Sequence, residues 1–289
     1  MRVAISGGNG FIGTKLVRAL VARGDDVTLL VRKASASAID EARVRRSPID
    51  DARSLDGADA IVNLAGAGVL DERWTEARLR VIRESRIETT RSLVARAANA
   101  RVLVSASAIG FYGMHMDDAE LDESSPRGDD VLARICDDWE NEARKASCRV
   151  AIARIGIVLG KDGGALARML PMFRRFLGGP LGDGKQWWSW IHVDDVVRAL
   201  LFAIDHDAMR GAFNATAPAP ATMNEVARTL GEVLHRPSAL RVPAFALRAA
   251  LGDAANVLLT GQRVLPRVLT DAQFEFRFRA LRDALAACV

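Results

Sequence analysis

The N-terminus carries a short apolar run, a cluster of glycines and then a helical apolar pattern, in the order of a strand, a turn and a helix. Gly7 permits a tight turn, Gly10 lets a pyrophosphate approach the backbone, and Gly13 lets the helix pack closely on the strand. Gly8 in place of Gly7 fits the spacing equally well. Because the N-terminus of the helix then faces the phosphates, this segment predicts a dinucleotide-binding site.

The end of the next predicted strand, at residues 27–31, favours one cofactor over another. A site that prefers NAD carries Asp or Glu there for the ribose 2′-hydroxyl. This chain carries Arg32 and Lys33 instead. A planar guanidinium and an ammonium both suit a 2′-phosphate. The sequence therefore predicts NADP(H) as the cofactor, with a solvated basic strand end as the alternative.

Length and composition are those of an ordinary globular protein. The chain has 289 residues, of which 49% are hydrophobic and 26% charged, enough for one large core or two modest domains. It has neither an apolar run of about 18 residues nor a signal-like start, so we expect a cytoplasmic protein that does not enter a membrane. The net charge of +4 lacks the basic stripe that nucleic-acid binding needs. Cys136, Cys148 and Cys288 lack metal-ligand spacing, so no metal site is predicted.

Strand and helix patterns alternate through the first half of the chain. Further strands are predicted at 43–47, 58–64, 102–105 and 149–154, with helices at 72–98 and 131–146. This alternation predicts an α/β fold with a Rossmann-type doubly wound parallel sheet, and the cofactor at the carboxyl ends of its strands. The acidic segment at 117–130 is expected to form a solvated edge.

Beyond about residue 158, glycines interrupt the pattern, which predicts a second and smaller α/β domain. We therefore expect an NADP(H)-binding Rossmann domain over residues 1–158 and a C-terminal substrate domain over residues 159–289. Helices are expected at 165–177, 195–204, 223–234 and 245–251. The helix at 195–204 is a candidate to pack back on the Rossmann domain.

Five motifs resemble the extended short-chain dehydrogenase/reductases, an NAD(P)-dependent epimerase-like family, over nearly the whole chain. They are SGGNGFIG at 6–13, NLAG at 63–66, SASAIGFYG at 105–113, RIGIVLG at 154–160 and WIHVDDVVRAL at 190–200. The chain looks closest to an atypical subgroup, through RW at 73–74, SRIETT at 85–90, LGGPLGDGKQWWSWIHVDD at 177–195 and TGQRVLP at 260–266. The resemblance implies NADP(H) binding without naming a substrate. Motif and resemblance together assign cofactor contacts to Gly7, Asn9, Gly10, Phe11, Ile12, Gly13, Arg32, Lys33, Leu64, Ala65, Gly66, Arg86 and Ser105.

The chain departs from this family at the catalytic pair. Active extended members use Tyr-x-x-x-Lys, and alignment on the Trp-Glu pair at 139–140 puts Leu132 and Cys136 at those positions. A neutral thiol is a poor replacement for a lysine cation. The family's catalytic Ser or Thr falls on Ser107 or Ala108, and the single tyrosine is Tyr112. Because a positioned acid or base contributes roughly 10² to 10⁴ in rate, ordinary sugar epimerisation is improbable.

Two functions remain open. One is an NADPH-dependent oxidoreductase acting on a small carbonyl or hydroxyl compound, with Ser107 or Tyr112 as the catalytic hydroxyl; the alternative for both is a purely structural role. The other is a sensor or regulatory protein that binds NADPH without turnover.

The resemblance also suggests a substrate side. Arg86 stands where relatives carry an Asn facing the nicotinamide, so it is a candidate contact for the cofactor or an acidic substrate, with a surface salt bridge as the alternative. Further pocket candidates are Trp74, Met169, Trp188 and Trp190, each with core packing or a helix surface as the plainer reading. The expected partner is a small molecule, and the chain is expected to be a monomer or a homodimer.

Overall fold

A parallel sheet of seven strands forms the centre of the larger part of the molecule. The computed structural model describes residues 1–32 and 42–289, so Lys33 lies outside the described residues. The strand order is β11-β7-β5-β4-β1-β2-β3, and every neighbouring pair is parallel. The strands are β1 (Arg2–Ser6), β2 (Asp26–Val31), β3 (Val44–Pro48), β4 (Ala60–Asn63), β5 (Val102–Ala108), β7 (Arg149–Ile155) and β11 (Gly211–Ala215). The predicted Rossmann-type fold is confirmed.

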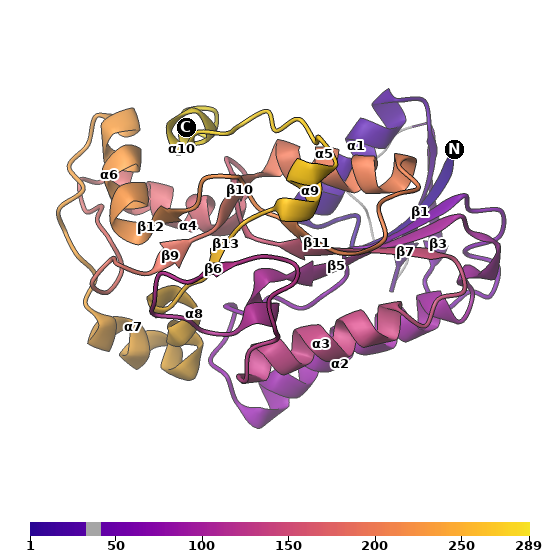
Figure 1. Cartoon of the computed structure of the whole chain (residues 1–289), viewed down its shortest axis with the longest axis horizontal. Helices are drawn as coiled ribbons and strands as arrows, with labels where there is room; N and C mark the ends of the chain where they lie inside the picture. The colour runs from indigo at the N-terminus through magenta and orange to yellow at the C-terminus, as the bar shows by residue number, and fades with distance from the viewer. Residues whose placement is uncertain (33–41) are drawn as a thin grey trace.

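Helices cover both faces of this sheet (Figure 1). On one face lie α1 (Phe11–Ala22) and α5 (Val193–Asp205), and on the other lie α2 (Glu76–Val94) and α3 (Val131–Ala143). The alternation of side chains along β1 explains the two layers, because Val3 and Ile5 join the first core and Ala4 joins the second. The helix predicted at 72–98 begins only at Glu76, where the Thr75 hydroxyl caps it by accepting a hydrogen bond from the Arg78 amide.

The smaller part has its own core, built on short strands and helices around Trp188, Trp190 and Met223. β8 pairs with β10 in parallel and β9 with β12 antiparallel. The elements of this part are β8 (Ile157–Gly160), α4 (Gly164–Arg174), β9 (Trp187–Trp188), β10 (Trp190–His192), β12 (Ala221–Thr222), α6 (Met223–Leu234), α7 (Ala244–Leu251), η3 (Gly252–Ala255), α8 (Asn256–Leu259) and α10 (Leu281–Ala286). Shorter elements elsewhere are η1 (Ala97–Asn99), η2 (Ile109–Tyr112), β6 (Glu120–Leu121), β13 (Arg263–Val264) and α9 (Arg267–Asp271).

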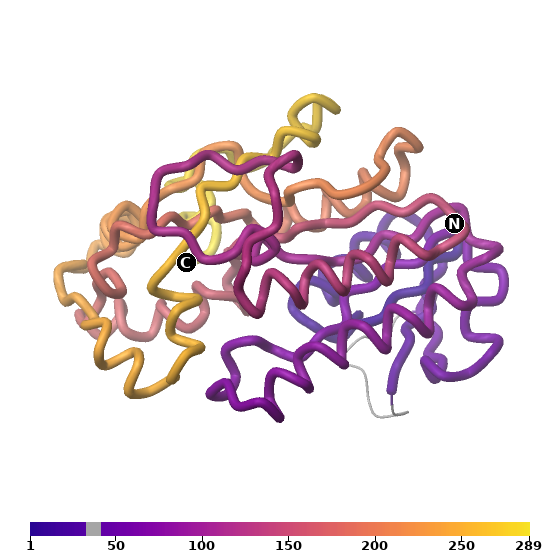
Figure 2. The backbone as a smooth tube through the Cα atoms, turned by 60° about the horizontal axis from the view of Figure 1, so that its bottom comes forward, coloured from indigo at the N-terminus to yellow at the C-terminus, as the bar shows by residue number. Residues whose placement is uncertain are grey.

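The chain returns to the large sheet after forming part of the small core. β11 adds the seventh strand beside β7, and α5 packs on α1. Leu269, Phe274 and Phe276 also join the core of the large sheet. Residues beyond 158 thus complete the large sheet, so a single division at residue 158 does not describe the packing. The sequence pattern gave no sign that 211–215 is a sheet strand. In the backbone trace of Figure 2, the orange segment that holds β11 lies beside the segment of β7.

The acidic segment at 117–130 is more than a solvated edge. Its β6 pairs with β13, and the Glu123 carboxylate accepts hydrogen bonds from the backbone amides of Asn214, at 2.8 Å, and Val268, at 3.2 Å. It thereby connects β11 to α9. Within the described ranges, no helix is long and apolar enough to cross a membrane, and no cluster of His, Cys, Asp and Glu is arranged to hold a metal ion.

Candidate cofactor site and catalytic network

The glycine turn after β1 has the geometry that a bound dinucleotide requires. Gly7 adopts φ +74°, and a Cβ there would lie 2.6 Å from the Leu64 backbone. A Cβ at Gly13 would lie 2.3 Å from the Gly7 carbonyl oxygen. At Gly10, by contrast, a Cβ would meet only that oxygen, at 3.2 Å, so the remaining space there is open. Gly7 and Gly13 thus close the turn, and Gly10 leaves room for a ligand.

The N-terminus of α1 offers hydrogen-bond donors to this open space. Gly10 is the N-cap residue, no side chain caps the helix, and the first turn contains no acidic residue. The first amides of the helix therefore lack the carboxylate or hydroxyl that would satisfy them in an ordinary capped helix. Together with the helix dipole, unsatisfied amides of this kind can hold a diphosphate.

A cavity of about 650 Å³ runs from this turn across the carboxyl ends of the strands. Its size suits a nucleotide. The exposed Arg32 lies at its edge, after β2. The α2 side chains Val81, Ser85 and Thr89 form the opposite wall, and the sequence analysis missed them because they lie on a helix face without any motif. The lining comprises Ser6, Gly7, Gly8, Asn9, Gly10, Leu29, Leu30, Val31, Arg32, Ile49, Leu64, Ala65, Gly66, Ala67, Val81, Ser85 and Thr89.

Five of the predicted cofactor residues that the structure describes do not line this cavity: Phe11, Ile12, Gly13, Arg86 and Ser105. Ser105 is fully buried, and its hydroxyl donates to the Ala106 carbonyl oxygen, so it belongs to the strand interior. Ile12 packs on the core of the large sheet. Phe11 turns toward the small part, where a Cβ at Gly163 would lie 2.5 Å from its ring. Phe11 therefore connects the first turn of α1 to the turn between β8 and α4.

A buried polar chain holds α2 and α3 on the sheet below the cavity. The Ser6 hydroxyl donates to Asn63 Oδ1 at 2.6 Å, and Asn63 Nδ2 donates to Thr90 Oγ1 at 2.8 Å. Trp139 Nε1 also donates to Thr90 Oγ1, at 2.9 Å. All four residues are buried. The chain links β1, β4, α2 and α3, and thus fixes the walls of the cleft relative to its floor.

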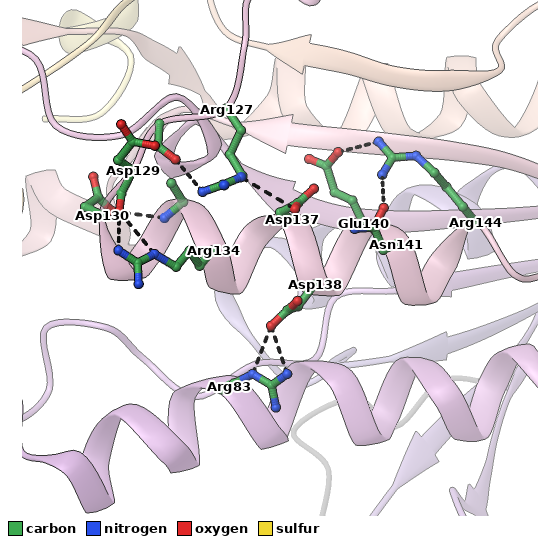
Figure 3. A network of polar contacts seen from close by, with 12 residues as sticks. Arg83, Arg127, Asp129, Asp130, Arg134, Asp137, Asp138, Glu140, Asn141 and Arg144 are labelled. Carbon is green, nitrogen blue, oxygen red and sulfur yellow. Dashed lines mark hydrogen bonds and ion pairs between the residues drawn. The ribbon is translucent and has the colours of Figure 1, made fainter.

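Beyond β4, the carboxyl end of β5 leads into a buried ionic network. The Ser107 hydroxyl donates to Glu140 Oε1 at 2.8 Å. Arg154 holds the same carboxylate through two contacts, from Nε at 2.8 Å and from Nη2 at 3.0 Å. The Arg154 guanidinium also lies 3.4 Å from the centroid of the Phe111 ring. Burial opposes the charge on Arg154, but its bonds to Glu140 raise its pKa above the ordinary value. Arg144 reaches Glu140 from solvent (Figure 3).

Tyr112 belongs to the same network and is 1% exposed. Its hydroxyl donates to Asn214 Oδ1 at 2.7 Å and accepts from Arg154 Nη1 at 3.0 Å. Burial raises the pKa of Tyr112 to about 12, even though the Arg154 charge acts in the opposite direction. The protons of Ser107 and Tyr112, the two candidate catalytic hydroxyls, are therefore already donated within the protein. The sequence did not reveal Glu140 and Arg154 as their partners, although an arginine inside an apolar strand signals a buried acid.

The positions aligned with Tyr-x-x-x-Lys lie on α3 without any charged group. Cys136 is buried beside Ser107, and burial raises the pKa of its thiol to about 12, so the thiol is neutral. Arg86 approaches this place from α2. Its Nη1 donates to the carbonyl oxygens of Ala67, at 3.1 Å, and Ile82, at 2.9 Å, and its guanidinium lies 5.2 Å from the Trp139 ring. The cation near this end of the cleft comes from α2 rather than α3.

The segment between β4 and α2 connects the two parts of the molecule. Arg73 donates to the carbonyl oxygens of Ala249 and Ala250 at the end of α7. Arg168 on α4 pairs with Asp71 at 3.0 Å. Figure 2 shows this segment beside α7. Because these bridges are polar and exposed, they are weaker than a packed core.

The predicted aromatic substrate wall is not exposed. Trp188 and Trp190 are 3% and 0% exposed, and both lie in the small core, which is the plainer of the two readings. The indole N–H of Trp190 donates to the Ala219 carbonyl oxygen. Met169 is half-buried against the same core. Trp74 precedes α2 rather than lying on it, and its indole donates to the Val69 carbonyl oxygen at 2.9 Å.

The match to known families covers most of the chain. The model of the NAD dependent epimerase/dehydratase family matches residues 3–215, and that of a domain of unknown function (DUF1731) matches residues 242–288. The chain belongs to the NAD-dependent epimerase/dehydratase family. The first match ends with β11, so it contains all seven strands of the large sheet.

Individual relatives agree with this family over nearly the full length. The chain is 44% identical to the "Epimerase family protein SDR39U1 homolog, chloroplastic" of Arabidopsis thaliana, in an alignment that covers 99% of this chain and 86% of the relative. The crystal structure of human epimerase family protein SDR39U1 (isoform 2) with NADPH has a TM-score of 0.92 and 37% identity, covering 99% and 98% of the two chains. A nucleoside-diphosphate sugar epimerase of Corynebacterium glutamicum has a TM-score of 0.78 and 33% identity, covering 99% of this chain and 57% of its own.

Proposed function

We propose that this protein binds NADPH and uses it to reduce a small carbonyl compound. The observation that carries the proposal is the open turn at Gly10 in front of the uncapped N-terminus of α1. The human relative crystallised with NADPH supports the same cofactor. NADPH, when bound, supplies a hydride to the carbonyl carbon. The residues of this chain hold the cofactor and the substrate in place.

Each part of the cleft has a proposed role in holding the cofactor. The first amides of α1 hold the diphosphate, and the adenosine lies along Leu29, Val31 and Ile49 in the cavity. Arg32 pairs with the 2′-phosphate through its planar fork. Residues 64–67, with Val81 and Ser85 opposite, enclose the middle of the cleft.

The proton that completes the alcohol is proposed to come from solvent. Ser107, at the end of β5, donates its own proton to Glu140, so its oxygen can only accept a further hydrogen bond. Tyr112 is buried behind it with both hydrogen bonds made. Without a positioned acid the rate falls by roughly 10² to 10⁴, so the proposed substrate is a reactive carbonyl compound.

Two observations favour a second candidate, an NADPH sensor without turnover. Both candidate hydroxyls are engaged within the network, and the aligned catalytic pair is replaced by Leu132 and Cys136. A sensor needs the cofactor cleft and an element that responds to it, but no acid or base. Phe11, which lies between the phosphate turn and the small part, is such an element.

Two measurements test these proposals. The first compares dissociation constants of NADPH and NADH by fluorescence in wild type and Arg32→Ala. We expect Arg32→Ala to reduce the preference for NADPH about tenfold, which corresponds to about 1.4 kcal/mol. An unchanged preference would remove Arg32 from the site. Arg18→Ala, at an exposed position on the outer side of α1, is the control.

The second measurement follows deuterium at the transferable position of NADPH, in the presence of dialysed and undialysed small-molecule extracts. Label loss that needs the undialysed extract supports the reductase, and the labelled product identifies its substrate. Tight NADPH binding without label loss, alongside an active control reductase, supports the sensor.

A further inference from the structure

Arg86 is held rigidly at the boundary between the cofactor cavity and α3. A Cβ at Gly66 would lie 3.0 Å from the Arg86 Cζ, so the guanidinium packs flat against a backbone that lines the cavity. Nη1 is fixed by the carbonyl oxygens of Ala67 and Ile82, and the Trp139 ring lies on the α3 side. The position of the charged group is thus set by three separate elements.

The charge of Arg86 has no counterion among the described residues. Two other arginines of α2 have carboxylate partners: Arg83 pairs with Asp138 at 2.8 Å, and Arg91 pairs with Glu142 at 3.3 Å. Arg86 makes no ion pair with a carboxylate in the described chain. Arg78 adds a second positive charge nearby; burial lowers the pKa of Arg86 from its ordinary value, and Arg78 acts in the same direction. A half-buried guanidinium in such surroundings is costly unless an anion reaches it.

The donors that remain on Arg86 are accessible. Only Nη1 donates to the described part of the protein, which leaves Nε and Nη2 for another acceptor. Neither atom is fully buried, so each keeps some exposed surface. Nε and Nη2 form one edge of the guanidinium fork, which is the geometry that binds a carboxylate or phosphate through two parallel hydrogen bonds.

We infer that Arg86 binds an anionic group, a carboxylate or a phosphate, on the substrate of the reaction. That the anion belongs to a substrate rests on the proposed function, but the anion site itself rests on the geometry of Arg86. Arg86 does not line the cavity itself; it packs against the lining residues Gly66 and Ala67, on the side of Cys136 and away from the diphosphate site at α1. The reducible compound is therefore a small acid or phosphate ester rather than a neutral molecule.

The test uses full-length protein saturated with NADPH. The undialysed extract is separated on a strong anion exchanger at neutral pH into an unretained fraction and a retained fraction that is eluted and desalted. Each fraction, and malonate as a defined dianion, is added to the protein, and the midpoint of thermal unfolding is recorded. The variants are Arg86→Met, which removes the charge, and Arg86→Lys, which keeps the charge and loses the fork. Arg83→Met, one turn earlier and paired on the surface (Figure 3), is the matched control.

We expect the retained fraction to raise the midpoint for wild type and Arg83→Met, and to have no effect on Arg86→Met. Arg86→Lys should need about tenfold more of the fraction or of malonate for the same shift, because one of two charge-assisted hydrogen bonds is lost. NADPH affinity should stay within about threefold across all variants that fold, since a charge-assisted contact to the cofactor would contribute more than that.

Three results would overturn the inference. A shift caused only by the unretained fraction, or by neither fraction, would mean that no anion binds. An equal response of Arg86→Met and wild type would mean that the anion binds elsewhere. A loss of NADPH affinity beyond about tenfold in Arg86→Met would assign Arg86 to the cofactor phosphates. A positive shift without deuterium loss would leave the anion site standing and reject hydride transfer, so the two proposals fail separately.

Discussion

The two halves of the cleft differ in whether the protein already satisfies the hydrogen bonds of their polar groups. At the glycine turn, the amides of α1 and the Arg32 side chain face open space. At the end of β5, Ser107, Tyr112 and their partners satisfy each other inside the protein. A ligand site needs donors that the fold leaves unused, whereas a saturated network stabilises the fold and offers nothing to a ligand. By this criterion, we expect the cofactor half to bind a ligand and the network half to stabilise the fold.

The largest effect is expected from Glu140→Ala in the network. The substitution leaves the Arg154 guanidinium buried without its carboxylate, which typically costs about 3–5 kcal/mol. We expect a large drop in the free energy of unfolding measured with urea, while the molecules that remain folded bind NADPH normally. Glu84→Ala, at an exposed position on α2, serves as the control. A loss below about 1 kcal/mol would contradict the view that this half is structural.

The second effect is expected from Gly10→Ala in the cofactor half. Its backbone, at φ −77° and ψ 174°, suits alanine, and the new methyl meets only one carbonyl oxygen, at 3.2 Å. The protein should fold and lose NADPH affinity by about 100-fold, or about 2.7 kcal/mol, because the methyl fills the space of the diphosphate. Gly13→Ala is the comparison, since its Cβ would lie 2.3 Å from the Gly7 oxygen and should destabilise the fold itself. Normal binding by Gly10→Ala would place the diphosphate elsewhere.

The same contrast explains how much could be predicted from the sequence. Gly7 and Gly13 serve local geometry, and local geometry is encoded in adjacent residues, so the tight turn at Gly7 and the close packing at Gly13 could be predicted from the sequence. The role of Gly10 toward a pyrophosphate stays a prediction. The sheet and most helices followed from periodicity for the same reason. Ser107 and Tyr112 were identified as candidates by type, but their partners Glu140 and Asn214 are 33 and 102 residues away in sequence.

Long-range pairing also explains the other differences. β11 has only five residues and no motif, and it is a sheet strand because β7 offers a free edge. The sequence pattern of Trp188 and Trp190 is the same whether they line a pocket or lie in a core. The packing of α6 and α10 around them places them in the core. In the sequence, nothing distinguishes Glu123 from the other acids of its segment, because its partners come from β11 and α9, far along the chain.

A third effect is expected from Tyr112→Phe, which tests whether this hydroxyl is structural. The change leaves Asn214 Oδ1 and an N–H of Arg154 without their partner, at a cost of about 1–3 kcal/mol in unfolding free energy. Hydride transfer per folded molecule should change little. If deuterium loss from NADPH fell by about 100-fold while stability stayed the same, the hydroxyl would be the catalytic acid and the two halves of the cleft would not differ as argued.

The smallest effect concerns Glu123, where the network reaches the surface. Burial raises the pKa of this carboxyl above its ordinary 4.5, although backbone amides of Asn214 and Val268 donate to it. The folded protein thus binds the proton more tightly than the unfolded chain, so Glu123 favours folding below pH 4.5 and this contribution is lost as the pH rises through its folded pKa. Glu123→Gln removes that dependence. The variant should therefore gain stability relative to wild type between about pH 4 and pH 7, by on the order of 1 kcal/mol or less.

The neighbouring Asp122 provides a control of opposite sign. The Ser124 hydroxyl lowers the pKa of its carboxyl, so Asp122 stabilises the folded state at neutral pH and this contribution is lost as the pH falls. Asp122→Asn should be less stable than wild type near pH 7, and the difference should shrink toward acid pH. Urea unfolding across the pH series measures both. Parallel curves for Glu123→Gln and wild type would mean that its carboxylate is solvated, and that the network ends at Asn214 rather than continuing to the acidic segment.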